Sequence, residues 1–190
     1  MRLIALAGLL SLSTWAADMP YWIDARPGGD TELAEWALRA WEKASGGELH
    51  LVRAAKRETA LLRVVWVIGP DGLYGEARPI VVDGKKGFEL FVRPEMDGLG
   101  PDIEAAARKD PLLRDAIVYL TCLHESGHGL GMPHTAKFED IMYSFGYGGD
   151  IAEYFGRYRR TLSKREDIHK NSGMSEADGE RFRRLLASSQ

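Results

Sequence analysis

Three histidines and a glutamate lie close together in the second half of this 190-residue chain, where residues 124–134 read HESGHGLGMPH. His124 and His128 are four residues apart, so on a helix both imidazoles project from one face and can bind one metal ion. Glu125 is rotated by about 100° from His124, so its carboxylate can reach a water at the metal without being a ligand.

His134 needs a change of backbone direction to join the other two histidines. On a continued helix it would lie about 15 Å along the axis from His124 and about 80° off its face. Gly129 and Gly131 break the helix, and Gly131 can adopt the positive φ that lets the chain turn back. We therefore expect His134 to complete a site of three imidazoles.

Three neutral imidazoles with one open position suit a catalytic zinc ion better than a closed structural site. Zinc polarises a substrate carbonyl and acidifies its bound water. Glu125 would take the proton of that water and later pass it to the leaving amine. The sequence thus predicts one zinc ion held by His124, His128 and His134, with Glu125 as the catalytic residue. Calcium is not evident, because the aspartates show no calcium-loop spacing.

Helical periodicity surrounds this motif. Apolar residues recur at steps of three and four from Leu112 to Leu123, so the first two histidines lie near the end of a helix. Another helix is expected over 31–45, with Trp41 anchoring it to a sheet. Asp150 can cap a third helical segment, and Ser175 with Asp178 forms a capping box for a last helix.

Strand-like segments separate the first two helices. They cover residues 49–53, 61–68, 80–82 and 88–92, with turns at 69–72 and 83–85. One helix, a run of strands and then further helices make an α+β pattern. No repeat or linker divides the chain, so residues 17–190 are predicted to form a single catalytic domain.

The first 16 residues, MRLIALAGLLSLSTWA, have the composition of a secretory signal peptide. Their apolar run is too short to span a bilayer. Cys122 is the only cysteine, so an exported chain without a disulfide suits the bacterial periplasm or exterior. Lys and Arg total 25 against 28 Asp and Glu, a net charge of −3 that argues against a nucleic-acid partner.

The motif resembles the zinc signature of the metzincin metallopeptidases, H-E-x-x-H-x-x-G-x-x-H. That family also has a methionine turn beneath the metal, and Asp140-Ile141-Met142-Tyr143 is similar to it. Thr135 after the third histidine and the Ile-Met-Tyr turn are most like the matrixin branch and its bacterial relatives.

The resemblance implies a twisted mixed sheet with an active-site helix and a C-terminal helix, and zinc in a cleft between upper and lower parts. An edge strand, Phe88–Val92 or its neighbour, would bind a peptide substrate as an added strand. Residues 143–149 would line the pocket for the side chain that follows the cleaved bond. The implied activity is that of a secreted zinc endopeptidase.

Several features depart from the matrixin pattern. No cysteine precedes Cys122, so the usual inhibitory cysteine of a pro-segment is missing. Ser144 stands where some related branches carry a tyrosine close to zinc. Residues 150–172 exceed what a compact matrixin would use between Met142 and Ser175, so an added helix near the cleft is expected.

Two alternatives remain open from the sequence. The chain could be a zinc-containing binding or inhibitory module without turnover, although a binder does not need Glu125 beside the water. A downstream carboxylate such as Glu153 could replace His134 as the third ligand.

Overall fold

The computed structural model describes residues 18–26, 30–68 and 74–188. The predicted signal peptide at 1–16 and the predicted turn at 69–72 lie outside the described residues. Within those residues no helix is both long and apolar enough to cross a membrane.

Five strands form one mixed sheet in the order β2-β1-β3-β5-β4. The edge strand β4 runs antiparallel to β5, and the other neighbours are parallel. The strands are β1 (Met19–Ile23), β2 (Leu51–Arg53), β3 (Leu62–Trp66), β4 (Gly75–Val82) and β5 (Lys85–Val92). Parallel neighbours require crossover connections, and α1 supplies the one between β1 and β2.

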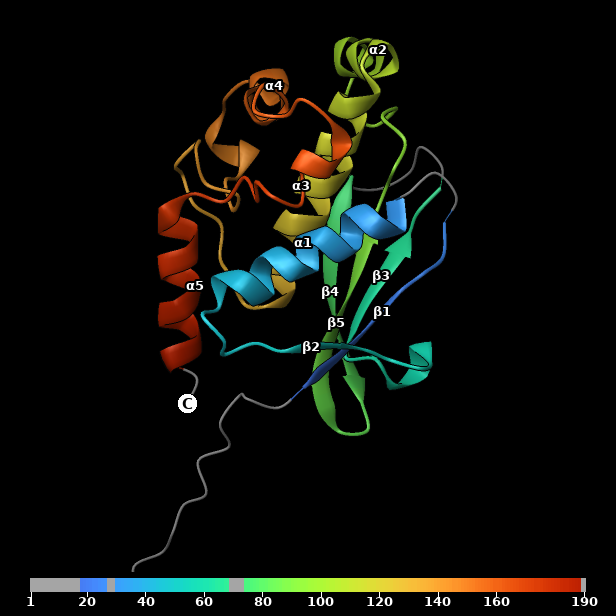
Figure 1. The fold of residues 1–190 in the computed structure, drawn as a ribbon, viewed down its shortest axis with the longest axis vertical. Helices are drawn as coiled ribbons and strands as arrows, with labels where there is room; N and C mark the ends of the chain where they lie inside the picture. Colours follow the sequence, from blue (N-terminus) through green and yellow to red (C-terminus); the bar gives the residue numbers. More distant parts are fainter. Residues whose placement is uncertain (1–17, 27–29, 69–73, 189–190) are drawn as a thin grey trace, which may run out of the picture.

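In the part of the chain that the structure describes, five α-helices accompany the sheet, which confirms the α+β class and the mixed sheet. In Figure 1, α1 runs across the strands, α5 stands at one end of α1, and α2 and α4 lie at the top of the view. The helices are α1 (Asp30–Ala44), α2 (Pro101–Lys109), α3 (Pro111–Gly129), α4 (Ile151–Arg159) and α5 (Glu176–Ser188).

The predicted helices and strands are all present, and two elements were missed. β1 precedes α1, where alternating buried and half-buried residues over only five positions give a weak strand signal beside Pro20. α2 is a separate helix, since Asp110 ends it and then caps α3 by accepting from the N–H groups of Leu112 and Leu113. Asp150 caps α4 in the same way.

The prediction that Phe88–Val92 could be the substrate-binding edge strand is wrong. Those residues belong to β5, which pairs with β3 on one side and with β4 on the other. Asp83 and Gly84, with φ of 50° and 76°, make the tight two-residue hairpin that folds β4 onto β5. The neighbouring strand β4 is therefore the free edge.

Trp41 joins α1 to α3 and α5. Its Nε1 donates to the Leu123 carbonyl at 2.8 Å, and Phe182 lies edge-on with ring centroids 4.8 Å apart. The indole is fully buried, so its N–H needs this partner. This contact fixes α1 to the turn of α3 that carries the first histidine.

Glycine lets the end of α3 lie directly on the sheet. A Cβ on Gly129 would overlap the ring of Phe88 in β5, whereas a Cβ on Gly156 in α4 would meet only the flexible guanidinium of Arg160, at 3.3 Å. Gly129 therefore permits the close approach of α3 to the sheet, whereas Gly156 only lowers the stability of its helix.

Gly129→Ala should lower the free energy of unfolding by about 1–3 kcal/mol, because overpacking displaces Phe88. Gly156→Ala, the matched change on an open helix surface, should raise it by about 0.5–1 kcal/mol. Denaturant unfolding of both variants without added metal tests this. Equal effects of the two changes would show that α3 does not lie against Phe88 as described.

Candidate metal centre

The three predicted histidines converge on one point. The Nε2 atom of His134 lies 3.2 Å from Nε2 of His124 and 2.9 Å from Nε2 of His128. Three ligand atoms of these residues all lie within 4.8 Å of one another, close enough to bind one metal ion. A tetrahedral site with metal–nitrogen bonds of about 2.05 Å would hold its nitrogens about 3.3 Å apart.

Backbone carbonyls orient two of the rings. His124 Nδ1 lies 2.7 Å from the Ile141 oxygen, and His128 Nδ1 lies 3.0 Å from the Met132 oxygen. A carbonyl can only accept, so each Nδ1 carries the proton and each Nε2 presents its lone pair. This is the tautomer that a metal ligand requires.

The chain turns back after α3 as predicted. Gly131 has a φ of 93°, and the N–H of Met132 donates to the Gly127 carbonyl at 2.8 Å. Beyond His134, Thr135 pairs with Tyr143 in an isolated bridge, and its N–H donates to Met142 at 2.8 Å. The turn and the bridge together bring His134 and residues 140–143 under the histidines of α3.

Met142 is fully buried below α3. A Cβ on Gly127 would overlap the Met142 sulfur, so the helix and the methionine are in direct contact. Met142 therefore supports the helix that carries the histidines from below, at the position where the resemblance places a methionine turn.

A buried polar network holds the segment that carries Met142. Asp178 accepts from the Ile141 N–H at 2.8 Å and from Arg181 at 2.7 Å. Asp140 accepts from Ser175 at 2.7 Å and pairs with Arg181 at 2.8 Å. Both carboxylates are fully buried. The start of α5 is thereby tied to Ile141, the residue whose carbonyl orients His124.

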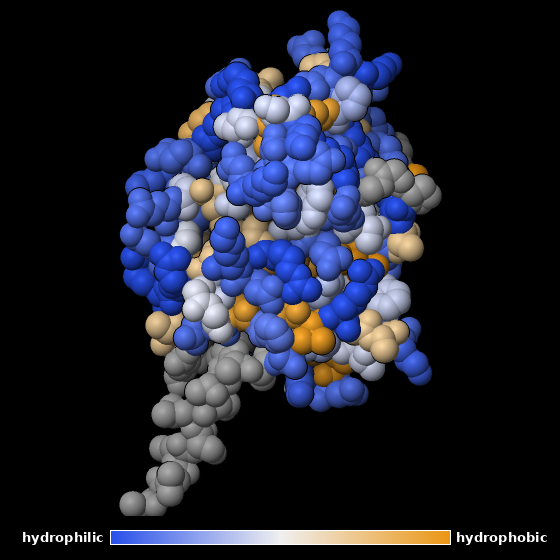
Figure 2. Space-filling model, viewed as in Figure 1, coloured by the Kyte–Doolittle hydropathy of each residue, from blue (hydrophilic) through white to orange (hydrophobic). Residues whose placement is uncertain are grey.

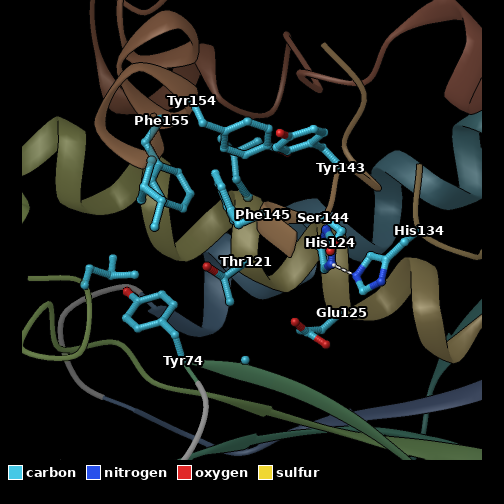
Figure 3. Close-up of a pocket in the computed structure, with 14 residues that line it drawn as sticks. Tyr74, Thr121, His124, Glu125, His134, Tyr143, Ser144, Phe145, Tyr154 and Phe155 are labelled. Atoms are coloured by element: carbon cyan, nitrogen blue, oxygen red, sulfur yellow. Dashed lines mark hydrogen bonds between the residues drawn. The ribbon is translucent and has the colours of Figure 1, made fainter. Parts of the chain in front are cut away.

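Glu125 lies beside the histidines, next to the edge of the sheet. It is only 9% exposed, and in Figure 3 its carboxylate lies just below His124 and His134. A Cβ on Gly75 of β4 would lie 2.7 Å from its Oε1 atom, so this glycine permits the close approach. Burial, together with the nearby Glu76 carboxylate, raises the pKa of Glu125 to about 7.

Desolvation also favours the neutral form of His124 and His134. Burial lowers the pKa of His124 to about 4, against the opposing effect of its hydrogen bond to Ile141. Partial desolvation and the proximity of His128 lower the pKa of His134. Neutral imidazoles are the form that binds metal, so the site needs little deprotonation before an ion enters.

A cavity of about 190 Å³ opens beside His124 and Glu125 (Figure 3). Its walls are mostly aromatic and aliphatic, and they come from the start of β4 and the residue before it, from the loop before α2, from α3, from residues 143–145 and from α4. They comprise Tyr74, Gly75, Leu99, Leu120, Thr121, Tyr143, Ser144, Phe145, Ile151, Tyr154 and Phe155. Of the predicted wall 143–149, only its first three residues line the cavity, and Tyr147 is 65% exposed outside it.

Glu153 does not replace His134 at the site. It lies on α4 and pairs with Arg160 at the surface, 3.1 Å from its Nη1 atom. Cys122 is buried in the core, and burial raises the pKa of its thiol well above the usual range. The geometry therefore favours the ligand set predicted from the motif.

No protein-family model matches this chain. A comparison with curated proteins also finds no match.

Several residues that build the site were not singled out as such from the sequence. Gly75 and Tyr74 follow a turn and carry no motif, so nothing along the chain links them to His124. Tyr154 lies in the helical segment predicted after Asp150, and Asp178 was placed in a capping box, which it does form with Ser175. Their contacts with the site depend on tertiary packing alone.

Zinc should stabilise the folded chain, because a ligand that binds only the native state adds about 2.7 kcal/mol at a hundred times its Kd. His134→Ala should weaken zinc binding by more than about a hundredfold, since even outer partners of metal ligands contribute 10–100-fold. Glu153→Ala is the control and should bind as the parent does. Competition with a chromophoric chelator measures all three affinities, and loss of binding in the control would contradict the assigned ligands.

Proposed function

We propose that this chain is an exported zinc endopeptidase of the metzincin type, most similar to the matrixin branch and its bacterial relatives. The observation that carries the proposal is the convergence of three imidazole nitrogens beside a buried carboxylate with a raised pKa. The site opens beside a free sheet edge and an apolar cavity. Peptide hydrolysis needs a metal site, a general base, and surfaces that bind the substrate backbone and a substrate side chain.

The donor set fits zinc. Three neutral nitrogen ligands leave one coordination position open, which is typical of catalytic rather than structural zinc. A bound zinc ion would supply Lewis-acid chemistry, polarising the scissile carbonyl and acidifying a water. The residues that would hold it are His124, His128 and His134, each presenting Nε2.

Glu125 is the proposed general base. A carboxylate with a pKa near 7 in the metal-free chain is a much stronger base than an exposed glutamate, and a nearby cation would lower that value. Glu125 would accept the proton of the attacking water and then protonate the leaving amine, so the proton balance closes within one turnover. Its position against Gly75 keeps the carboxylate between the metal site and the sheet edge.

The fold is consistent with the resemblance. The edge strand β4 runs antiparallel to its neighbour, and its first residues, Gly75 and Glu76, lie beside Glu125. A peptide that pairs with β4 as an added strand would pass directly over the metal site. Met142 beneath the histidines and the capped α5 helix agree with the methionine turn and last helix of that family.

The apolar cavity is the proposed site for the side chain that follows the cleaved bond. Two of the hydroxyls on its walls already donate within the protein: Tyr143 to the Gly148 carbonyl at 2.6 Å and Thr121 to the Ile117 carbonyl at 2.9 Å. Most of the remaining wall is apolar, so a polar substrate side chain would lose water there and gain few new hydrogen bonds.

A binding or inhibitory module without turnover is the second candidate. Ser144 supports it, because that position carries a tyrosine in some related enzymes. The pKa of Glu125 argues against it, since a binder has no use for a buried carboxylate that can exchange a proton near neutral pH.

Glu125→Gln should retain zinc and lose at least about a thousandfold in kcat, since positioned proton transfer contributes about 10²–10⁴-fold. The measurement is hydrolysis of a quenched-fluorescent peptide library by residues 17–190, with and without a zinc chelator. Glu76→Gln removes the neighbouring carboxylate instead and should keep most of the activity. A zinc-loaded, folded parent chain that cleaves nothing would favour the binding module.

Peptides with Leu, Met or Phe after the cleaved bond should react at least about tenfold faster than those with Asp or Lys, because burying an unpaired charge costs more than 1.4 kcal/mol. Sequencing the products of a mixed library measures this preference. Phe155→Leu reshapes the cavity wall and should shift the preference among apolar residues. An unchanged profile would place the substrate side chain elsewhere.

A further inference from the structure

The role of α4 is unexplained by the proposed chemistry, although this helix lies against the metal site. Its buried face consists of Tyr154, Phe155 and Tyr158, each no more than 6% exposed. Asp150 fixes the start of the helix, and α4 packs on α3, the helix that carries His124 and His128. A movement of α4 would therefore reach the site directly.

The Tyr154 hydroxyl contacts the carbonyl that orients a metal ligand. It lies 3.2 Å from the Ile141 oxygen and 3.1 Å from the Asp140 oxygen. The Ile141 oxygen is also the acceptor for His124 Nδ1, at 2.7 Å. One carbonyl thus accepts from a residue of α4 and from a metal ligand of α3, using both of its lone pairs.

The ring of the same tyrosine forms part of the cavity wall. Tyr154 lies 5.2 Å from Phe145 and 6.1 Å from Tyr143, measured between ring centroids, and all three line the cavity. The Arg157 guanidinium lies 4.6 Å from the centroid of the Tyr154 ring, which adds a cation–π contact. In Figure 3 the rings of Tyr154 and Tyr143 stand side by side above His124.

We propose that Tyr154 is a positioning residue that links the occupant of the apolar cavity to the orientation of His124. A substrate side chain that enters the cavity contacts the ring of Tyr154, and the Tyr154 hydroxyl transmits that displacement to the Ile141 carbonyl. The Ile141 N–H belongs to the preceding peptide group, which Asp178 holds through a hydrogen bond of 2.8 Å. The Ile141 carbonyl belongs to the following peptide group, so it can turn about the Cα–C bond while the N–H stays in place. This carbonyl is the adjustable point between α4 and His124.

Tyr154 should affect both metal binding and the turnover of substrates. The effect of Tyr154 on metal binding depends only on the contacts of the metal-free chain. The effect on substrates rests on the proposed peptidase function. Metal affinity and catalysis are therefore measured separately, so that failure of one part can be told from failure of the other.

The first experiment compares Tyr154→Phe with Tyr158→Phe. Both changes remove one hydroxyl from the buried face of α4, but the Tyr158 hydroxyl donates to the Asn171 carbonyl at 2.6 Å, within the segment that follows α4. Tyr154→Phe should weaken zinc binding by about tenfold, as loss of an outer partner of a metal ligand does. Tyr158→Phe should leave the zinc affinity within about twofold of the parent value, because it does not contact the site.

The absorption spectrum of bound Co²⁺ is a measurement that a general loss of stability would not change. The visible absorption of bound Co²⁺ reports ligand geometry, so it should shift in Tyr154→Phe and remain unchanged in Tyr158→Phe. Thermal unfolding of both variants without metal shows how much stability each has lost. Equal losses of zinc affinity in the two variants, or an unchanged cobalt spectrum in Tyr154→Phe, would overturn the proposal.

The substrate part is tested with Phe155→Leu as the control, because Phe155 lines the same cavity and carries no hydroxyl. Tyr154→Phe should lower kcat several-fold while keeping the order of preference among apolar residues. Phe155→Leu should change that order and leave zinc affinity unchanged. A reduced kcat in Tyr154→Phe without any change in metal affinity or cobalt spectrum would contradict the link through Ile141. If neither the parent nor the variants cleave peptide while the metal effects appear, the peptidase function fails and the positioning role stands.

Discussion

The backbone of Ile141 is the constraint on which the metal centre depends. Its carbonyl accepts from His124 Nδ1 at 2.7 Å, and its N–H, which belongs to the preceding peptide group, donates to Asp178 at 2.8 Å. A histidine that binds metal through one nitrogen almost always donates the N–H of the other, which fixes the direction of the ring. The orientation of His124 on α3 thus depends on a carboxylate at the start of α5, through two planar peptide groups that meet at the Cα of Ile141.

The residues between the histidines serve packing as much as chemistry. Gly127 lets α3 lie against Met142, Gly129 lets it lie against Phe88, and Ser126 is fully buried and donates to the Cys122 carbonyl at 2.6 Å. One side of the C-terminal end of α3 carries the imidazoles of His124 and His128, and the other side packs against the sheet and Met142. Because both sides are fixed, the histidines have little freedom to move apart when the site is empty.

The sequence could predict what depends on local spacing, and it could not predict what depends on packing. The ligand set, Glu125, the helix that carries them and the turn at Gly131 all follow from a motif within eleven residues, and the structure places them as expected. The sequence could not predict that β4 is an edge strand, because strand order depends on pairing between distant segments. β1 was missed because five residues that include a proline are too few for a clear alternating pattern. Tyr154 lies in a predicted helix and Asp178 in a predicted cap, and their contacts with Ile141 became visible only with the chain folded.

Two buried carboxylates near the histidines illustrate opposite uses of burial. Asp178 is surrounded by donors: it accepts from the N–H groups of Ile141 and Ser175 and from Arg181, and this holds it in one direction. Replacing such a cluster with apolar side chains often raises stability, so its value lies in the geometry it imposes on the Ile141 peptide. Glu125 is buried against Gly75 and near another carboxylate, Glu76, and both effects favour its protonated form. The fold therefore holds one carboxylate in place with donors and leaves the other able to exchange a proton, which is the division of labour that a hydrolytic metal site requires.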